Sequence, residues 1–218
     1  MPNVAGGVPY ETVIFDMDGT LVDTLCMTVG AIAAHAPQCG LRVLSREEIL
    51  PAIGFGNEEF YRALYPEADE RQRRRIEALV EAGELAIGRT LGEKILFDGV
   101  VPMLRCLQDA GIRLVIASTA TRAHVEGCLG IGGILPFFRE IACGELDKTD
   151  MVRRLCRGRS AVVGDSVKDV VAAHQNGLAA LGAGFGYARE GGAAFDAIFD
   201  TPKTLLCALT GKSQPIAL

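Results

Sequence analysis

The sequence has little of what marks nucleic-acid-binding or membrane proteins. Its 22 Lys and Arg residues against 27 Asp and Glu residues give a net charge of -5, and no dense basic tract is present to hold phosphates or anionic lipid. No uninterrupted apolar run approaches the roughly 18 residues that span a bilayer, and the first residues lack a basic stretch followed by an apolar one. We therefore expect a cytoplasmic protein whose partners include neither nucleic acid nor a membrane.

The sequence also lacks the cysteine and histidine spacings of zinc and redox sites. Its 7 cysteines are scattered without pairs, which predicts reduced thiols that pack as small hydrophobes. His35, His124 and His174 have no second histidine three or four residues away, so we expect structural or surface roles for them. What remains, 49% hydrophobic and 22% charged residues in a chain of 218, is typical of one large globular domain or of a domain with an insertion.

Short apolar runs that end abruptly in polar or glycine residues alternate with segments that carry apolar residues at helical spacing. Such runs are typical of strands buried on both faces. Their alternation with helices predicts parallel strands joined by right-handed crossovers, and hence a Rossmann-like, doubly wound α/β core. We expect strands at 12–15, 114–117, 139–143, 161–163 and 179–185, and helices at 100–110, 122–129, 150–156 and 167–176.

The interval 24–94 breaks this alternation because it shows only helical patterns. A helical insertion directly after the first strand, at the edge where such sheets bind ligands, is placed to act as a lid. We therefore expect an α/β core domain of residues 1–23 and 95–218 and an all-helical cap domain of residues 24–94. Helices within the insertion are expected at 24–36, 45–53 (opened by a Ser-x-x-Glu capping signal), 57–65 and 69–89.

Two acidic motifs follow two of the predicted strands. Asp16 and Asp18 come directly after the first strand, before a glycine, and Asp165 and Asp169 follow the strand at 161–163. Since the carboxyl ends of parallel strands open at one edge of the sheet, the four carboxylates are expected to converge there. Like charges at close range call for a cation, and oxygen-only ligands favour a hard ion, Mg²⁺ if the substrate brings phosphate oxygens.

Ser118, at the end of another apolar strand, and Lys148 complete the set of candidate site residues. A hydroxyl and an ammonium are suitable donors to phosphoryl oxygens. Alone, each is compatible with a helix-capping serine or a surface lysine, and it is their combination with the acids that indicates a phosphate site.

These motifs, DMDGT (16–20), Ser118, Lys148 and GDSVKD (164–169), occur in the order seen in the haloacid dehalogenase superfamily. The chain resembles the phosphoglycolate phosphatase-like branch, which has a helical C1-type cap, and the resemblance spans residues 10 to about 190. It implies a Mg²⁺-dependent phosphatase acting on a small phosphorylated metabolite, as a monomer or homodimer.

The resemblance also implies roles for single residues. Asp16 would be the nucleophile that forms an aspartyl phosphate, and Asp18 the general acid and base. The metal would lie among Asp16, the main-chain carbonyl of Asp18 and Asp165, with Asp169 ligating through water or orienting its neighbours. Ser118, Thr119 and Lys148 would bind the phosphate.

Two alternatives stay open at this point. A phosphotransferase or sugar-phosphate mutase would keep both acids, but such enzymes often carry a His where this chain has Thr28. A non-catalytic phosphate-binding or regulatory module would not need the second acid, Asp18. The substrate is not specified, since the chain departs from the family pattern at Thr119. Within the insertion, we expect Phe55, Asn57 and Arg62 to face the leaving group.

Overall fold

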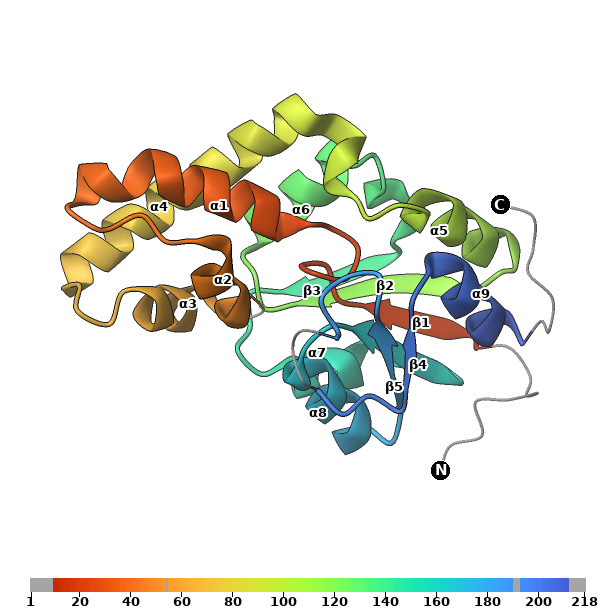
Figure 1. The fold of residues 1–218 in the computed structure, drawn as a ribbon. Coiled ribbons are helices and arrows are strands. Elements are labelled where there is room, and N and C mark those ends of the chain that lie inside the picture. The colour runs from red at the N-terminus through yellow and green to blue at the C-terminus, as the bar shows by residue number, and fades with distance from the viewer. Residues whose placement is uncertain (1–9, 54, 190–192, 212–218) are drawn as a thin grey trace.

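The computed structural model describes residues 10–53, 55–189 and 193–211, and these form a parallel sheet with helices on both faces and an all-helical insertion (Figure 1). The strands of the described chain lie in the order β3-β2-β1-β4-β5-β6, and every neighbouring pair is parallel. This is the doubly wound order, in which β2 and β3 lie on one side of β1, and β4, β5 and β6 lie on the other. Their bounds are β1 Thr12–Phe15, β2 Arg113–Ser118, β3 Glu140–Cys143, β4 Ser160–Gly164, β5 Ala179–Ala183 and β6 Ala197–Phe199.

Alternate residues of each central strand point to opposite faces of the sheet and bury against different helices. Val13 and Phe15 belong to the cluster that includes side chains of α5, α6 and α9, whereas Ile14 belongs to the cluster that includes side chains of α7 and α8. Because both faces are covered, the strands read as continuous apolar runs. The covering helices are α5 Val100–Asp109, α6 Arg122–Ile131, α7 Lys148–Leu155, α8 Val167–Gln175 and α9 Pro202–Thr210, with short 3-10 helices at Gly92–Ile95 and Leu135–Phe137.

The insertion after β1 is helical throughout its described residues and has its own apolar cluster. Leu25, Ile32, Ile49, Ile76 and Val80 are fully buried there. Capping boxes open α2 at Ser45 and α4 at Asp69, so the first of these confirms the capping signal read from the sequence. Figure 1 shows α1 and α4 side by side, with α2 and α3 along one flank of the pair. The elements are α1 Thr24–His35, α2 Arg46–Ile49, α3 Asn57–Leu64 and α4 Glu70–Leu91, with 3-10 helices at Ala36–Cys39 and Leu50–Ala52.

The doubly wound core predicted from the sequence is confirmed. The expected strands and helices are present with the same bounds or with bounds shifted by a few residues, except that the helix expected at 45–53 is a short α-helix followed by a 3-10 helix. Apart from short 3-10 helices, one strand and one α-helix were missed, β6 and α9, which follow the last strand that the sequence pattern indicated. A sixth strand of three residues has too short a pattern to be recognised, and it pairs only with β5 at the edge of the sheet.

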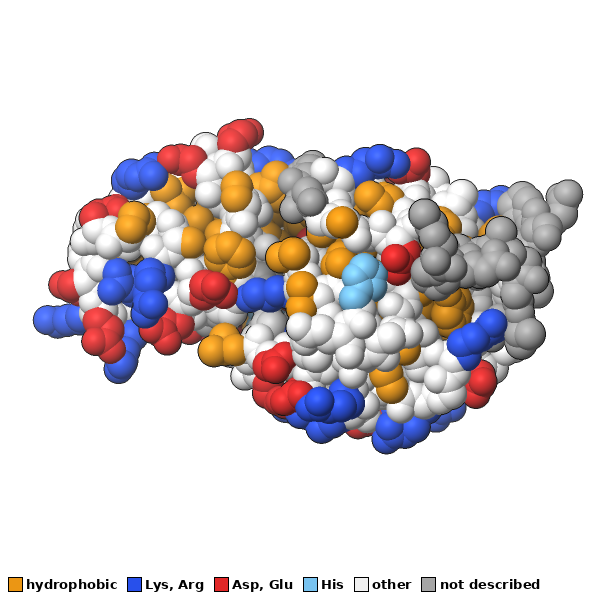
Figure 2. All heavy atoms as spheres, turned by 90° about the horizontal axis from the view of Figure 1, so that it is seen from below, with side chains coloured by type: hydrophobic (Ala, Val, Ile, Leu, Met, Phe, Trp, Pro, Cys, Tyr) orange, Lys and Arg blue, Asp and Glu red, His pale blue; other side chains and the backbone are white. Residues whose placement is uncertain are grey.

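The charged surface of the insertion mixes both signs. In Figure 2 the end of the molecule formed by α1–α4 carries Lys, Arg, Asp and Glu side chains interspersed. The charged segment DERQRRR at 69–75 lies on this insertion, and its Asp69, Glu70, Arg71 and Arg74 are exposed. This agrees with a solvated helix face rather than a patch of one sign.

Within the described residues, none of the helices combines the length and the apolar content needed to cross a membrane.

Candidate active site

The predicted acids gather at the carboxyl edge of the sheet, where β1 and β4 are neighbours. Asp16 follows β1 and Asp165 follows β4, and the register Phe15↔Val163 brings the two strand ends level. This is the point at which the strand order reverses, where open α/β sheets bind ligands. The chain then turns at Gly19, whose φ of 74° suits glycine; a Cβ there would lie 2.4 Å from Asp165 Oδ2.

Lys148 is buried among these acids. It is the first residue of α7, its side chain is 5% exposed, and its Nζ lies 2.6 Å from Asp16 Oδ1 and 2.7 Å from Asp169 Oδ1. Burial opposes its charge, but the two carboxylates outweigh burial and raise the pKa of Lys148 above its usual range. Lys148 therefore carries a positive charge in contact with the candidate nucleophile.

Asp169 accepts hydrogen bonds from the residues at the start of α8. Its Oδ2 accepts hydrogen bonds from Ser166 N at 3.0 Å, Ser166 Oγ at 2.8 Å and Asp165 N at 3.3 Å. The Asp169 carboxylate takes the place where residue 164 would carry a Cβ, which would lie 2.1 Å from Asp169 Cγ. Glycine at 164 is thus required for Asp169 to reach both the main chain and Lys148.

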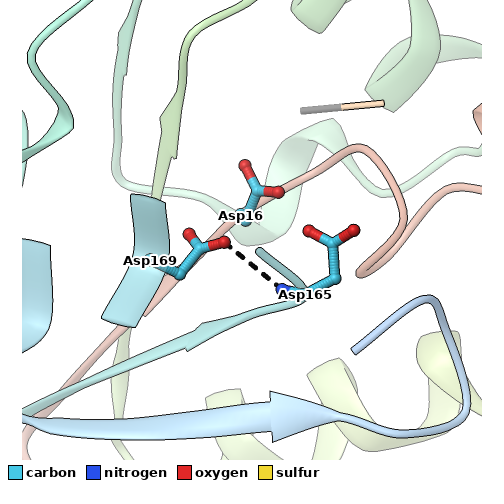
Figure 3. Close-up of side chains that lie close together, drawn as sticks. All are labelled: Asp16, Asp165 and Asp169. Atoms are coloured by element: carbon cyan, nitrogen blue, oxygen red, sulfur yellow. Dashed lines mark hydrogen bonds between the residues drawn. The ribbon is translucent and has the colours of Figure 1, made fainter. Parts of the chain in front are cut away.

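Three carboxylates form a compact, buried group: Asp16, Asp165 and Asp169 each offer an oxygen within 4.8 Å of the others. Figure 3 shows the three side chains converging above the ends of β1 and β4. Asp165 Oδ1 is buried without a hydrogen-bond partner among the described residues. Asp18, the fourth acid of the predicted metal set, does not belong to this group.

Burial and mutual repulsion raise the pKa values of two of these acids. Desolvation raises the pKa of Asp16 to about 7, with Asp169 and Asp18 adding to it and Lys148 opposing it. The pKa of Asp165 is raised well above its usual range by burial and by the charges of Asp16 and Asp169. A divalent cation among these oxygens would reverse both effects, so this donor set is chemically suited to a hard metal ion.

Asp18 faces a second polar cluster on the other side of the site. Its Oδ1 lies 3.3 Å from His124 Nε2 on α6, and the other ring nitrogen of His124 lies 3.5 Å from Glu84 Oε2 on α4. Burial lowers the pKa of His124, but its hydrogen bonds with Asp18 and Cys128 raise it well above the usual range. Burial raises the pKa of Glu84, against the effect of His124.

The two predicted phosphate-binding residues after β2 lie at the same cavity. Ser118 ends β2, is 1% exposed, and accepts a hydrogen bond through Oγ from Ala120 N at 3.1 Å. Thr119 follows it and lines the cavity together with Asp16, Asp18 and Lys148. The predicted site residues of the core that line this cavity are thus Asp16, Asp18, Ser118, Thr119 and Lys148, whereas Asp165 and Asp169 do not line it.

The insertion forms the opposite wall of this cavity, with apolar and acidic side chains: Ile53, Phe55, Phe60, Tyr61, Glu81 and Glu84. Of the residues expected to face the leaving group, Phe55 lines the cavity. Arg62 does not line it and instead pairs with Glu58 on the exposed face of α3. The Asn57 side chain and Gly54 lie outside the described residues.

His124 and Glu84 are site residues that the sequence did not reveal. His124 was expected to be structural or at the surface, and Glu84 falls within an ordinary amphipathic helix. Their contacts join positions 40 and 106 residues apart along the chain. No local spacing signals these contacts, because they depend on how α6 packs against the loop after β1 and on how α4 docks on α6.

Comparison with known proteins agrees with this architecture. Residues 13–183, which include both acidic motifs, match the family of haloacid dehalogenase-like hydrolases. A phosphoglycolate phosphatase of Synechococcus elongatus is 30% identical over 213 residues, covering 92% of this chain and 97% of that protein. One of Agrobacterium fabrum is 27% identical over 193 residues, covering 80% of each. The crystal structure of a predicted phosphoglycolate phosphatase from Haemophilus somnus has the same fold, with a TM-score of 0.77 at 23% identity over 90% of this chain and 96% of that one.

Proposed function

Because this chain belongs to the haloacid dehalogenase-like hydrolase family and is a phosphoric monoester hydrolase similar to phosphoglycolate phosphatases, we propose that it hydrolyses a small phosphorylated metabolite through Asp16 and Asp18. The observation that carries the proposal is the pairing of two nearby carboxylates with different environments. Asp16 contacts the Lys148 ammonium and the other acids, whereas Asp18 faces the cavity and His124. Different environments allow the two acids to take different roles.

Asp16 is the nucleophile in this proposal. One of its carboxylate oxygens forms a bond to phosphorus while the bond from phosphorus to the leaving-group oxygen breaks. The leaving alkoxide takes a proton from Asp18. Water then attacks phosphorus, gives its proton to Asp18, and frees Asp16 and inorganic phosphate. Lys148 keeps Asp16 in place and offsets part of the charge that the phosphate brings.

The carboxylate group fits a Mg²⁺ ion. Its donors are all oxygens, three of them lie within 4.8 Å of one another, and Asp165 Oδ1 is buried without a partner in the described structure. We assign Asp16, Asp165 and the main-chain carbonyl of Asp18 as ligands, and Asp169 as the residue that orients Asp165 and Lys148. A bound Mg²⁺ ion would supply the positive charge that lets a carboxylate approach a phosphate dianion.

Ser118, Thr119 and Lys148 are proposed to bind the transferred phosphoryl group. All three residues line the cavity beside Asp16 and Asp18, where donors would stabilise the charge of the transition state. Residues 24–94 are proposed to act as a cap domain over this edge. Its wall of Phe55, Phe60 and Tyr61 would exclude bulk water from the leaving-group side.

The proposal is tested by measuring phosphate release from a panel of phosphate monoesters, 2-phosphoglycolate among them, with Mg²⁺ and with EDTA. We expect Mg²⁺-dependent release from at least one alkyl phosphate, and Asp16→Asn should lower kcat by about 10⁴-fold or more because no other group is placed to form the covalent intermediate. Asp200→Asn, which alters an exposed acid paired with Arg189, is the matched control and should keep the wild-type rate.

The outcomes distinguish the alternatives. Release that survives EDTA, or an Asp16→Asn variant as active as the control, contradicts the assigned roles. Transfer of the phosphoryl group to a second hydroxyl without release of phosphate identifies a phosphotransferase or mutase. Mg²⁺ and phosphate binding without turnover identifies a binding module.

A further inference from the structure

A buried histidine joins the candidate acid of the core to the insertion. His124 is 8% exposed, and its two ring nitrogens lie 3.3 Å from Asp18 Oδ1 and 3.5 Å from Glu84 Oε2. Asp18 belongs to the loop after β1, whereas Glu84 belongs to α4 of the insertion and is itself 9% exposed. The reaction proposed above uses Asp18 but assigns nothing to His124 or Glu84.

Glu84 is fixed from the side opposite His124. The hydroxyl of Thr28 on α1 donates to Glu84 Oε1 at 2.5 Å, so each carboxylate oxygen of Glu84 contacts a different helix. A buried carboxylate with both oxygens engaged has little freedom to rotate, and removing one of its partners is costly. Glu84 therefore holds the His124 ring, and the ring holds Asp18.

A second contact docks α4 at the same place. One turn before Glu84, Glu81 Oε1 accepts a hydrogen bond from Thr121 Oγ1 at 2.5 Å. Thr121 caps α6, and its Oγ1 accepts a hydrogen bond from His124 N at 3.2 Å. The two glutamates thus face the first turn of α6, where the helix dipole favours negative charge. Docking of α4 and placement of the His124 ring depend on one set of contacts.

We propose that His124 is a positioning residue for Asp18, and that Glu84 makes this positioning depend on α4 being docked against the core. The inference rests on the proposed function, in which Asp18 protonates the leaving group. Proton transfer needs a heavy-atom separation of about 2.6–3.2 Å, and a carboxylate held by a fixed ring stays within that reach for more of the time than a free one. Asp18 is therefore held in position as the general acid only when α4 of the insertion is docked against the core.

Two variants and two matched controls test this role. His124→Gln keeps a polar side chain but removes the ring, and Glu84→Gln keeps the size of the side chain but removes its charge. His174→Gln alters an exposed histidine that also faces an aspartate, Asp196, at 3.2 Å. Glu77→Gln alters a glutamate on the same helix as Glu84 that does not line the cavity.

The readout is the single-turnover rate of leaving-group release on two esters that differ in their need for a proton. This rate reports only the first step, whereas hydrolysis of the aspartyl phosphate, in which Asp18 acts as base, is common to both esters. One is the alkyl phosphate that the panel above finds to be hydrolysed best, whose alkoxide must be protonated. The other is 4-nitrophenyl phosphate, whose nitrophenolate leaves without a proton. General acids contribute about 10²–10⁴-fold, so we expect His124→Gln to lower the rate of leaving-group release from the alkyl ester by about 10- to 100-fold and from the nitrophenyl ester by less than about threefold. Glu84→Gln should show the same contrast at smaller size, and both controls should match wild type.

A purely structural role for His124 predicts something else: equal losses on the two esters, or a rise in KM alone. Either result, or no loss at all, overturns the positioning role while leaving the proposed function intact. If circular dichroism shows that His124→Gln does not fold, the contrast between the two esters in Glu84→Gln decides the question. A wild-type protein without Mg²⁺-dependent phosphate release contradicts the proposed function itself, and this role with it.

Discussion

Lys148 places its ammonium group 2.6 Å from Asp16 Oδ1 and 2.7 Å from Asp169 Oδ1, with 5% of its side chain exposed. The Lys148 ammonium thus contacts two carboxylates of a buried group of three, of which Asp165 is the third member. Since charges are expensive to bury without partners, the acids at this edge depend on Lys148 when no metal is bound. Its removal is the single change that most directly exposes their repulsion.

Lys148→Met should therefore lower the free energy of unfolding by about 3 kcal/mol, at the lower end of the cost of breaking a buried ion pair. The loss should shrink when Mg²⁺ is added, because the ion replaces the missing charge. Urea denaturation with and without Mg²⁺ measures both. Lys168→Met is the matched control: Lys168 pairs with exposed Glu59 at 3.0 Å, and its loss should cost about 0–1 kcal/mol. Equal costs for the two lysines would show that the buried pairs contribute no more than a surface pair.

Residue by residue, the sequence revealed the acids and missed their neighbours. Asp16 and Asp165 each follow a recognisable buried strand, so a local pattern placed them at one edge. Lys148 has no strand end to mark it and was singled out only in combination with the acids. His124 and Glu84 escaped because their contacts join separate elements, and an isolated histidine is compatible with many roles.

Between elements, the two chain segments that connect the insertion to the sheet meet at one aromatic ring. The hydroxyl of Tyr187 donates to Asp23 Oδ1 and accepts a hydrogen bond from Leu25 N at 3.2 Å, both at the start of α1. On the returning segment, the Phe97 ring packs edge-on against Tyr187 at a centroid distance of 5.6 Å. Tyr187, which follows β5, thus ties the entry and the exit of the insertion to the core.

Tyr187→Phe keeps the ring and its packing but leaves Asp23 and the Leu25 N–H each without one partner. We expect a loss of about 1–2 kcal/mol in the free energy of unfolding, the usual cost of an unmade buried hydrogen bond, measured by urea denaturation. Tyr10→Phe, at a ring that stacks under Arg159 at 5.2 Å, is the control of equal size and should cost less. A Tyr187→Phe variant as stable as wild type would mean that water replaces the hydroxyl at this junction.

For whole helices and strands, the sequence pattern predicted the presence of an element better than the residues at which it begins and ends. The strand at 12–15 was placed to the residue, whereas the helix expected at 150–156 begins two residues earlier, at Lys148. That difference matters because it puts Lys148 on the first turn of α7 rather than in a loop. Its cause is the Asp147 side chain, which accepts a hydrogen bond from Thr149 N and starts the helix there.

Over the whole molecule, the carboxyl edge of the sheet makes stability depend on pH. Burial raises the pKa of Asp16 to about 7 and raises that of Asp165 as well. A raised carboxyl pKa means that the folded state binds protons more tightly than the unfolded state. The stability of the metal-free protein therefore falls as pH rises from the ordinary range of a carboxyl group to about 7.

Mg²⁺ binding should show the opposite dependence, because the ion competes with protons for the same oxygens. We expect saturating Mg²⁺ to raise Tm clearly at about pH 8 and by little at about pH 5, where protons occupy the site. Differential scanning fluorimetry at constant ionic strength measures both shifts, and Asp165→Asn should reduce the shift at the higher pH. Equal shifts at the two pH values would mean that the ion binds elsewhere.

Local patterns were enough to predict the alternation of strands and helices, the place of the helical insertion, and the meeting of Asp16, Asp165 and Asp169 at one edge, since each follows from a periodicity or a strand end. That Glu84 and His124 reach Asp18, and that Tyr187 joins both connections of the insertion, became visible only in the folded chain. Those contacts span 106 and 164 residues at their widest. They arise from how loops and helices far apart along the chain pack together, and side-chain periodicity carries no information about that packing.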